Sequence, residues 1–185
     1  MLSTWLNSCP GMDYQHDVAS GFSGAVKSIT RLLHMKFSTR CDTDSSAPDL
    51  FDRISDFNQI EHLLMRRGAS VQRIDPAQEP GTGIGWNIGF DWRARARELR
   101  LEVVRFDRPE RLTMSGLSDS FDIVVDMTVV ALGRNRSRLI FETEIRPRNM
   151  RARLMLQTAK LGKGQLDRKF TRRIDAFVAE LQPAQ

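Results

Sequence analysis

The alternation of apolar and polar residues predicts that most of the chain forms β-strands. In residues 36–44, Phe37, Thr39 and Cys41 alternate with charged or polar neighbours, which is the period of a half-buried strand. Similar runs occupy residues 84–91, 97–106, 111–117, 121–132 and 137–146, and a further strand begins at Val71. Turn-forming segments such as 107–110 and 133–136 separate the later runs. Because a parallel pair needs a long crossover connection, these strands should pair as antiparallel neighbours.

Two short helices are expected between the first strand and the second. Ser46 is a good N-cap, and Pro48 falls in the first turn, where its missing N–H costs nothing. The helix that follows should bury Leu50, Phe51 and Ile54. A second helix, residues 57–64, should end at Gly68, because glycine readily adopts the conformation that closes a helix.

The C-terminal segment, residues 149–181, predicts one long amphipathic helix. Gly162 and Gly164 are the positions at which this helix should bend, if it bends. The apolar residues expected near one face are Met150, Leu154, Leu161, Leu166, Phe170, Ile174, Phe177 and Leu181.

The first 34 residues differ from the rest of the chain and are interpreted as a leader. Val18, Phe22 and Val26 have roughly helical spacing within a stretch that is otherwise rich in glycine and polar residues. The leader is interpreted as a loose tail, a start-site artefact or a helix that docks on the body of the protein. Residues 35–185 suit one domain with a single core.

Three local motifs follow one another along the predicted domain. Residues 45–57 read Ser-Ser-Ala-Pro-Asp-Leu-Phe-Asp-Arg-Ile-Ser-Asp-Phe, in which an Ala-Pro pair opens one helix and Asp-Phe opens the next. Residues 81–86, Gly-Thr-Gly-Ile-Gly-Trp, form a glycine-rich entry to a strand, and residues 107–112, Asp-Arg-Pro-Glu-Arg-Leu, form a proline turn. Their order resembles that of the SRPBCC superfamily, which includes START domains and polyketide cyclases, over nearly everything after Met35.

The resemblance implies an α+β helix-grip fold, with a curved antiparallel β-sheet wrapped around a long C-terminal helix and two short helices after strand one. In this superfamily the space between sheet and helix usually receives an apolar ligand. The resemblance therefore implies that the protein binds or carries a lipid, an isoprenoid or quinone, or an aromatic molecule. The chain departs from the family pattern in the arginine-rich hairpin after Asp91, where many relatives have a glycine turn.

Strand alternation predicts which residues face this interior. An apolar lining suits such ligands because burial of apolar surface makes few directional demands. The same residues would equally suit a filled core, although Met114, Met127, Met150 and Met155 favour a pliable pocket. Ile123 and Leu139 should also face inward, and the predicted ligand-binding residues are Trp86, Ile88, Phe90, Leu99, Leu101, Val103, Leu112, Met114, Val125, Met127, Val129, Phe141, Met150 and Leu154.

The net charge of +5 and the pI near 9.8 come mostly from arginine and allow an anionic surface partner such as RNA or an acidic membrane. Arg93, Arg95 and Arg97 form a basic hairpin tip that could supply such a surface. The alternative is a solvated face that keeps the protein soluble. The partner proposed from sequence is therefore an apolar small molecule, with the anionic surface partner as an alternative.

The sequence contains no recognisable catalytic residues, metal ligands or cofactor motif. The three histidines lack metal-ligand spacing, and Gly81, Gly83 and Gly85 precede a strand rather than the helix of a dinucleotide fingerprint. Carboxylates within the strands should face solvent by alternation. An enzyme of the cyclase or aromatase type remains an alternative, and an inward ionisable group such as Arg97 or Glu98 would favour it.

The chain has neither an apolar run of membrane-spanning length nor the pattern of a secretory signal. A cytoplasmic location with reduced Cys9 and Cys41 is the resulting expectation. Composition and pattern leave the oligomeric state open.

Overall fold

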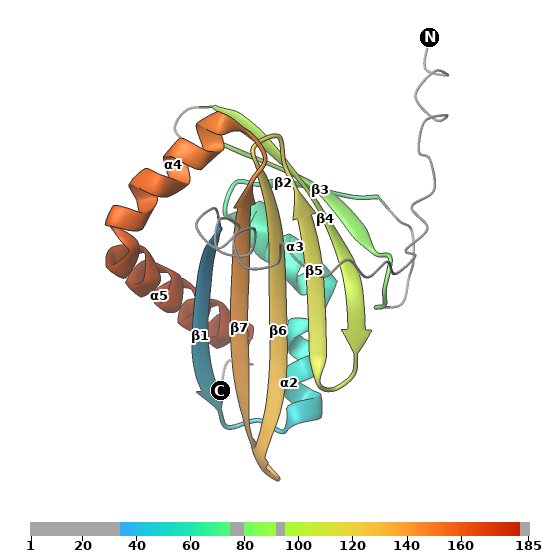
Figure 1. The fold of residues 1–185 in the computed structure, drawn as a ribbon. Coiled ribbons are helices and arrows are strands. Elements are labelled where there is room, and N and C mark those ends of the chain that lie inside the picture. The colour runs from blue at the N-terminus through green and yellow to red at the C-terminus, as the bar shows by residue number, and fades with distance from the viewer. Residues whose placement is uncertain (1–33, 75–79, 92–94, 182–185) are drawn as a thin grey trace, which may run out of the picture. The chain divides into compact units, whose positions relative to one another are not determined.

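The computed structural model describes residues 34–74, 80–91 and 95–181. The predicted leader, apart from His34, lies outside the described residues. The described residues form one antiparallel sheet of seven strands and four helices (Figure 1). No helix in this part of the chain is long and apolar enough to cross a membrane.

The strands lie in the order β1-β7-β6-β5-β4-β3-β2, and every neighbouring pair is antiparallel. The predicted strands are confirmed to within one or two residues at each end. Their bounds are β1 Met35–Thr43, β2 Ser70–Arg73, β3 Gly85–Asp91, β4 Ala96–Asp107, β5 Arg111–Leu117, β6 Phe121–Gly133 and β7 Arg136–Pro147.

The sheet curves, and one cause of its curvature lies within β4. Val103 pairs with Met114 and Arg105 pairs with Thr113, so Val104 is an additional residue in the ladder. Such a bulge bends its strand and increases the local twist. It also shifts the alternation by one residue, which lets Phe106 pack against the core.

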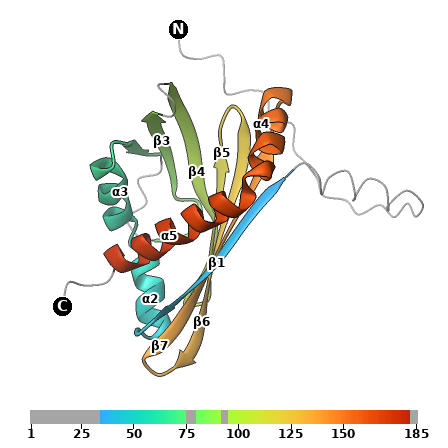
Figure 2. The ribbon, with the colours of Figure 1, turned by 90° about the vertical axis from the view of Figure 1, so that its left-hand side faces the viewer.

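The two short helices, α2 (Ala47–Ile54) and α3 (Phe57–Arg66), begin where the capping residues predict. The Ser46 side chain accepts a hydrogen bond from the backbone N–H of Asp49 at 3.3 Å, and the Asp56 carboxylate accepts one from Gln59 at 3.0 Å. Apolar residues of both helices pack on the concave side of the sheet, which Figure 2 shows from the side.

The C-terminal segment forms two helices, α4 (Met150–Leu161) and α5 (Lys163–Leu181), instead of one. Gly162 separates them, and they run in clearly different directions (Figure 2). The predicted bend is therefore a complete break. Because each helix turns its own face to the sheet, one apolar stripe does not continue along both.

The core lies between the concave face of the sheet and α5. Ile174, Val178 and Leu181 of α5 are buried there against strand residues and against α2 and α3. The helix-grip arrangement predicted from the sequence is confirmed. The buried strand residues of this cluster are Ile84, Trp86, Ile88, Val103, Leu112, Met127, Val129 and Leu139.

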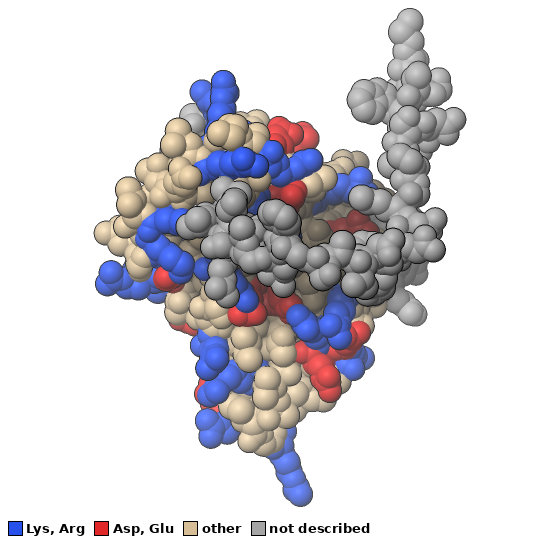
Figure 3. Space-filling view, in the orientation of Figure 1, with Lys and Arg blue, Asp and Glu red and all other residues tan. Residues whose placement is uncertain are grey.

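The outer face of the sheet carries charged residues that pair across neighbouring strands. Arg111 of β5 contacts Asp126 of β6, and Lys36 of β1 lies 3.3 Å from Glu142 of β7. Basic and acidic side chains are interspersed over this face (Figure 3). Much of the positive charge there is therefore balanced locally, and such exposed pairs contribute little to stability.

Cys41 of β1 packs against the core on the side that α5 covers. Burial raises the pKa of its thiol, and the negative charge of Asp175 on α5 raises it further. A raised pKa leaves less reactive thiolate at a given pH. The reactivity of this thiol therefore reports on the position of α5.

In a Cys9→Ser background, we expect Cys41 to be alkylated slowly by iodoacetamide at pH 8. Asp175→Asn removes a charge that raises the thiol pKa, so the pH profile of alkylation should move to lower pH. Asp167→Asn, which changes a charge of α5 that pairs with Lys163, is the matched control. An identical pH profile for all three proteins would contradict the position of α5 over β1.

Candidate functional site

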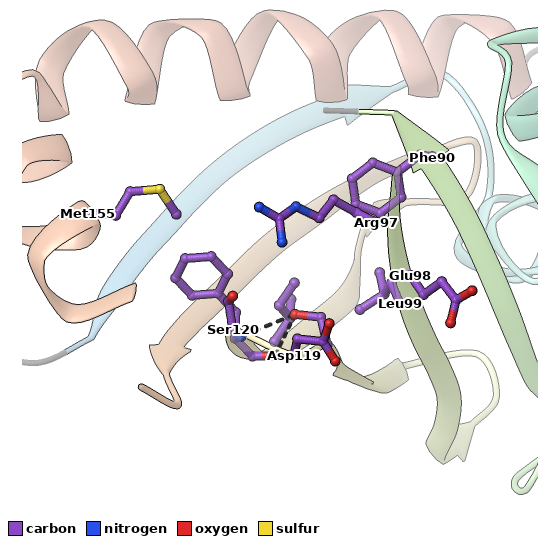
Figure 4. A pocket seen from close by; sticks show the side chains of 10 residues that line it. Phe90, Arg97, Glu98, Leu99, Asp119, Ser120 and Met155 are labelled. Atoms are coloured by element: carbon purple, nitrogen blue, oxygen red, sulfur yellow. Dashed lines mark hydrogen bonds between the residues drawn. The ribbon is translucent and has the colours of Figure 1, made fainter. Parts of the chain in front are cut away.

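A cavity of about 220 Å³ lies at the end of the sheet that α5 does not cover. It is bounded by β3, β4, β6, the turn between β5 and β6, and α4 (Figure 4). The residues that line it are Phe90, Arg97, Glu98, Leu99, Ser118, Asp119, Ser120, Phe121, Ile123 and Met155.

The walls of the cavity are mostly apolar, and the absence of a side chain at Gly116 makes room for two of the lining side chains, Leu99 and Ile123. Gly116 of β5 lies opposite Ile123 of β6. A Cβ atom at Gly116 would lie 3.2 Å from the Leu99 Cδ1 atom and 3.4 Å from the Ile123 Cβ atom. A larger residue at Gly116 would therefore push these side chains into the cavity.

The turn at one side of the cavity is held by hydrogen bonds. The Ser118 hydroxyl donates to the carbonyl of Phe121 at 3.0 Å and accepts from its N–H at 3.1 Å. Arg148 donates to the Ser118 carbonyl at 2.9 Å, and Asn149 donates to the Asp119 carbonyl at 3.3 Å. Because Asn149 also caps α4, these bonds tie the turn to the beginning of that helix.

Arg97 brings a positive charge into the apolar cavity. It pairs with Phe90 across the hairpin and so lies on the concave face, whereas the next residue, Glu98, points away (Figure 4). The Arg97 Nε atom is buried without a hydrogen-bond partner, and no ion pair to Arg97 occurs in the described part of the chain. Of the two inward ionisable groups considered from sequence, the structure turns Arg97 inward.

A second, more polar hollow of about 500 Å³ lies beside α2 and α3. Its two arginines already have partners. Arg108 pairs with Asp52 at 2.6 Å, and Arg73 donates to Asn58 at 2.9 Å and to Glu61 at 2.8 Å. The positive charges of this hollow are therefore neutralised within the protein, in contrast to Arg97.

The predicted ligand-binding residues fall into three groups. Phe90 and Leu99 line the cavity. Trp86, Ile88, Val103, Leu112, Met127 and Val129 are buried in the core, and Leu101, Met114, Val125 and Phe141 are partly buried against it. Met150 and Leu154 are 73% and 66% exposed. The residues of the second group therefore fill the interior of the protein, which was the alternative interpretation of the sequence.

Trp86 illustrates the difference between a core residue and a cavity residue. Its ring contacts Phe57 edge-on at a centroid distance of 5.0 Å. Its indole N–H donates to the Glu61 carboxylate at 2.6 Å. The apolar body and the polar end of this side chain are both occupied, which leaves no group free for a ligand.

The sequence-based orientation of α4 is wrong. Met150 and Leu154 were expected to face the sheet, but α4 instead buries Ala152 and Leu156. The break at Gly162 is the physical reason, because the stripe defined by α5 does not extend into a helix of different direction. Met155, which sequence analysis singled out only as a pliable residue, lines the cavity.

Sequence analysis missed the turn residues Ser118, Asp119 and Ser120, because a turn carries no periodic signal that shows where its side chains point. Phe121 could have been found, since alternation from the inward Ile123 places it on the same face. The predicted basic hairpin tip is not a single surface patch. Arg93 lies outside the described residues, Arg95 is exposed, and Arg97 turns into the cavity.

No family model matches the chain, and no curated protein sequence matches it. Similar solved structures do exist. The Zhui aromatase/cyclase from Streptomyces sp. R1128 is 11% identical, with 80% of this chain and 93% of that chain covered at a TM-score of 0.58. A START superfamily protein from Mycobacterium smegmatis is 12% identical, with 80% and 99% covered at a TM-score of 0.56.

Norcoclaurine synthase from Thalictrum flavum, solved in complex with dopamine and hydroxybenzaldehyde, is 14% identical. The match covers 92% of this chain and 99% of that chain at a TM-score of 0.56. At such identities the likeness concerns the fold. The described residues have the helix-grip fold predicted from the sequence, and these solved structures are similar to it in fold.

Two aromatic residues of β3 offer a test of which predicted residues belong to the core and which face the cavity. Trp86 is 4% exposed and Phe90 is 39% exposed. Trp86→Ala should lower the free energy of unfolding by about 3–5 kcal/mol, as for other large buried residues. Phe90→Ala should cost much less, because Phe90 faces a space that is already open. Urea denaturation of both variants measures the difference, and equal losses would contradict the assignment.

Proposed function

We propose that this protein binds a compact, largely apolar molecule in the cavity between the sheet and α4. The observation that carries this proposal is an unfilled space with mostly apolar walls on the concave face of the sheet, next to the residues that pack in the main core. The strands supply apolar walls through Phe90, Leu99, Phe121 and Ile123, and α4 supplies one through Met155. A space of this kind is the usual form of a small-molecule site.

The size of the cavity favours an aromatic ligand over a long lipid or isoprenoid chain. A cavity of about 150 Å³ in another protein accommodates benzene, so about 220 Å³ suits a molecule of one or two rings. A longer chain would have to extend out of the opening. The aromatic rings of Phe90 and Phe121 would also give a planar ligand favourable ring contacts.

Apolar contact alone would give weak binding. An aromatic molecule that buries about 200 Å² of apolar surface gains about 5 kcal/mol at ~25 cal/mol per Å². That energy corresponds to a dissociation constant of roughly 0.2 mM before the entropic costs of association. A tighter complex would therefore need a directional polar contact as well.

The solved structures support a ligand of this size. The norcoclaurine synthase structure contains dopamine and hydroxybenzaldehyde, which are single-ring compounds, and another similar structure is an aromatase/cyclase. These structures therefore agree with the proposal that the ligand is an apolar or aromatic small molecule.

An enzyme of the cyclase or aromatase type is the second candidate, and the inward position of Arg97 favours it. A guanidinium can stabilise an oxyanion or enolate, but it stays protonated and cannot accept a proton. The carboxylates among the lining residues are Glu98, which points away from the cavity, and Asp119 in the turn. Binding is therefore the better supported function.

Filling the cavity should abolish binding of an aromatic probe. Ile123→Trp places a large ring in the space that the ligand would occupy, whereas Val124→Trp places the same ring on the opposite face of β6. Isothermal titration with naphthalene derivatives is the measurement. We expect the first variant to lose binding by at least tenfold and the second to match the unmodified protein.

Thermal unfolding of both variants shows whether they remain folded. Equal binding by the folded Ile123→Trp variant and the unmodified protein would refute this location of the site. Failure of the unmodified protein to bind any apolar aromatic probe would refute the proposed function itself.

A further inference from the structure

We propose that the ligand of this cavity is an aromatic carboxylate whose anionic group pairs with Arg97. This inference rests on the proposed function and specifies the class of its ligand. The ion pair between the carboxylate and Arg97 would supply the directional polar contact that apolar burial alone does not provide.

The position of Arg97 follows from the geometry of the hairpin. Residues that face each other across an antiparallel pair share one face of the sheet. Arg97 faces Phe90, and the next pair along the hairpin, Ile88 and Leu99, lies on the same concave face. The guanidinium consequently points from β4 into the cavity (Figure 4).

The charge of Arg97 is unmatched within the described residues. Its Nε atom is buried and has no hydrogen-bond partner. Three arginines of the outer face are different, since Arg111, Arg138 and Arg146 each contact a carboxylate. A half-buried guanidinium without a partner costs free energy because it gives up hydration without receiving an equivalent bond.

The two carboxylates that also line the cavity do not fulfil this role. Glu98 follows Arg97 directly and therefore points to the other face of β4. The Asp119 side chain is also directed away from the guanidinium (Figure 4), and no ion pair joins it to Arg97 in the described part of the chain. Their charges lie at the border of the cavity, so the guanidinium is the charged group that a ligand inside would meet.

A planar carboxylate matches the chemistry of this position. A guanidinium presents its N–H donors in a flat fork that binds the two oxygens of a carboxylate together. The phenyl rings of Phe90 and Phe121 and the side chains of Leu99 and Ile123 would contact the aromatic part of the same molecule.

The experiment compares 2-naphthoate with 2-naphthamide, which has nearly the same shape and no charge. Isothermal titration at low salt should show that the full-length protein binds the carboxylate 10- to 100-fold more tightly, as expected for a charge-assisted pair. Arg97→Met, which keeps an unbranched side chain, should remove this preference and leave the affinity for the amide nearly unchanged. Arg95→Met removes an exposed arginine two residues away and should retain the preference.

The outcomes separate this inference from the proposed function. Equal affinity for the two probes in the unmodified protein would overturn the inference and leave the apolar site standing. A carboxylate preference that persists in Arg97→Met, or disappears in Arg95→Met, would also overturn it. Binding of neither probe would refute the proposed function. The comparison of the two probes needs no variant, so it remains decisive if Arg97→Met does not fold.

Discussion

The packing of α5 against the concave face of the sheet is the interaction on which the rest of the structure depends. Ile174, Val178 and Leu181 fill the central part of the concavity together with α2 and α3. Gly162 separates α5 from the preceding helix, α4, which runs in a different direction (Figure 2). What remains open is the end of the sheet beyond α5, and this is where the cavity lies.

The strands could be predicted because their signal is local. Residues 111–117 were assigned without error, since alternation and a proline turn define both the strand and its beginning. The division of the C-terminal segment into two helices could not be predicted in the same way. A glycine permits a break, but whether the helix bends or stops depends on the surfaces against which its two halves pack.

The same limit applies to the site. Leu99 and Leu112 have equivalent positions in the strand pattern, yet Leu99 lines the cavity and Leu112 is fully buried. What differs is the element on the opposite side, and alternation carries no information about that element. Arg97 shows what alternation does provide, because strand parity alone separates it from Glu98.

The cavity and the main core are built largely from different residues, since Phe90, Ile123 and Met155 are outside the cluster buried beneath α5. Substitutions in the cavity walls should consequently leave most of the folding energy intact. The walls of the cavity can thus change in sequence while the architecture persists. This freedom accounts physically for backbones that remain superimposable when only about one residue in eight is shared, as with the START protein at 12% identity.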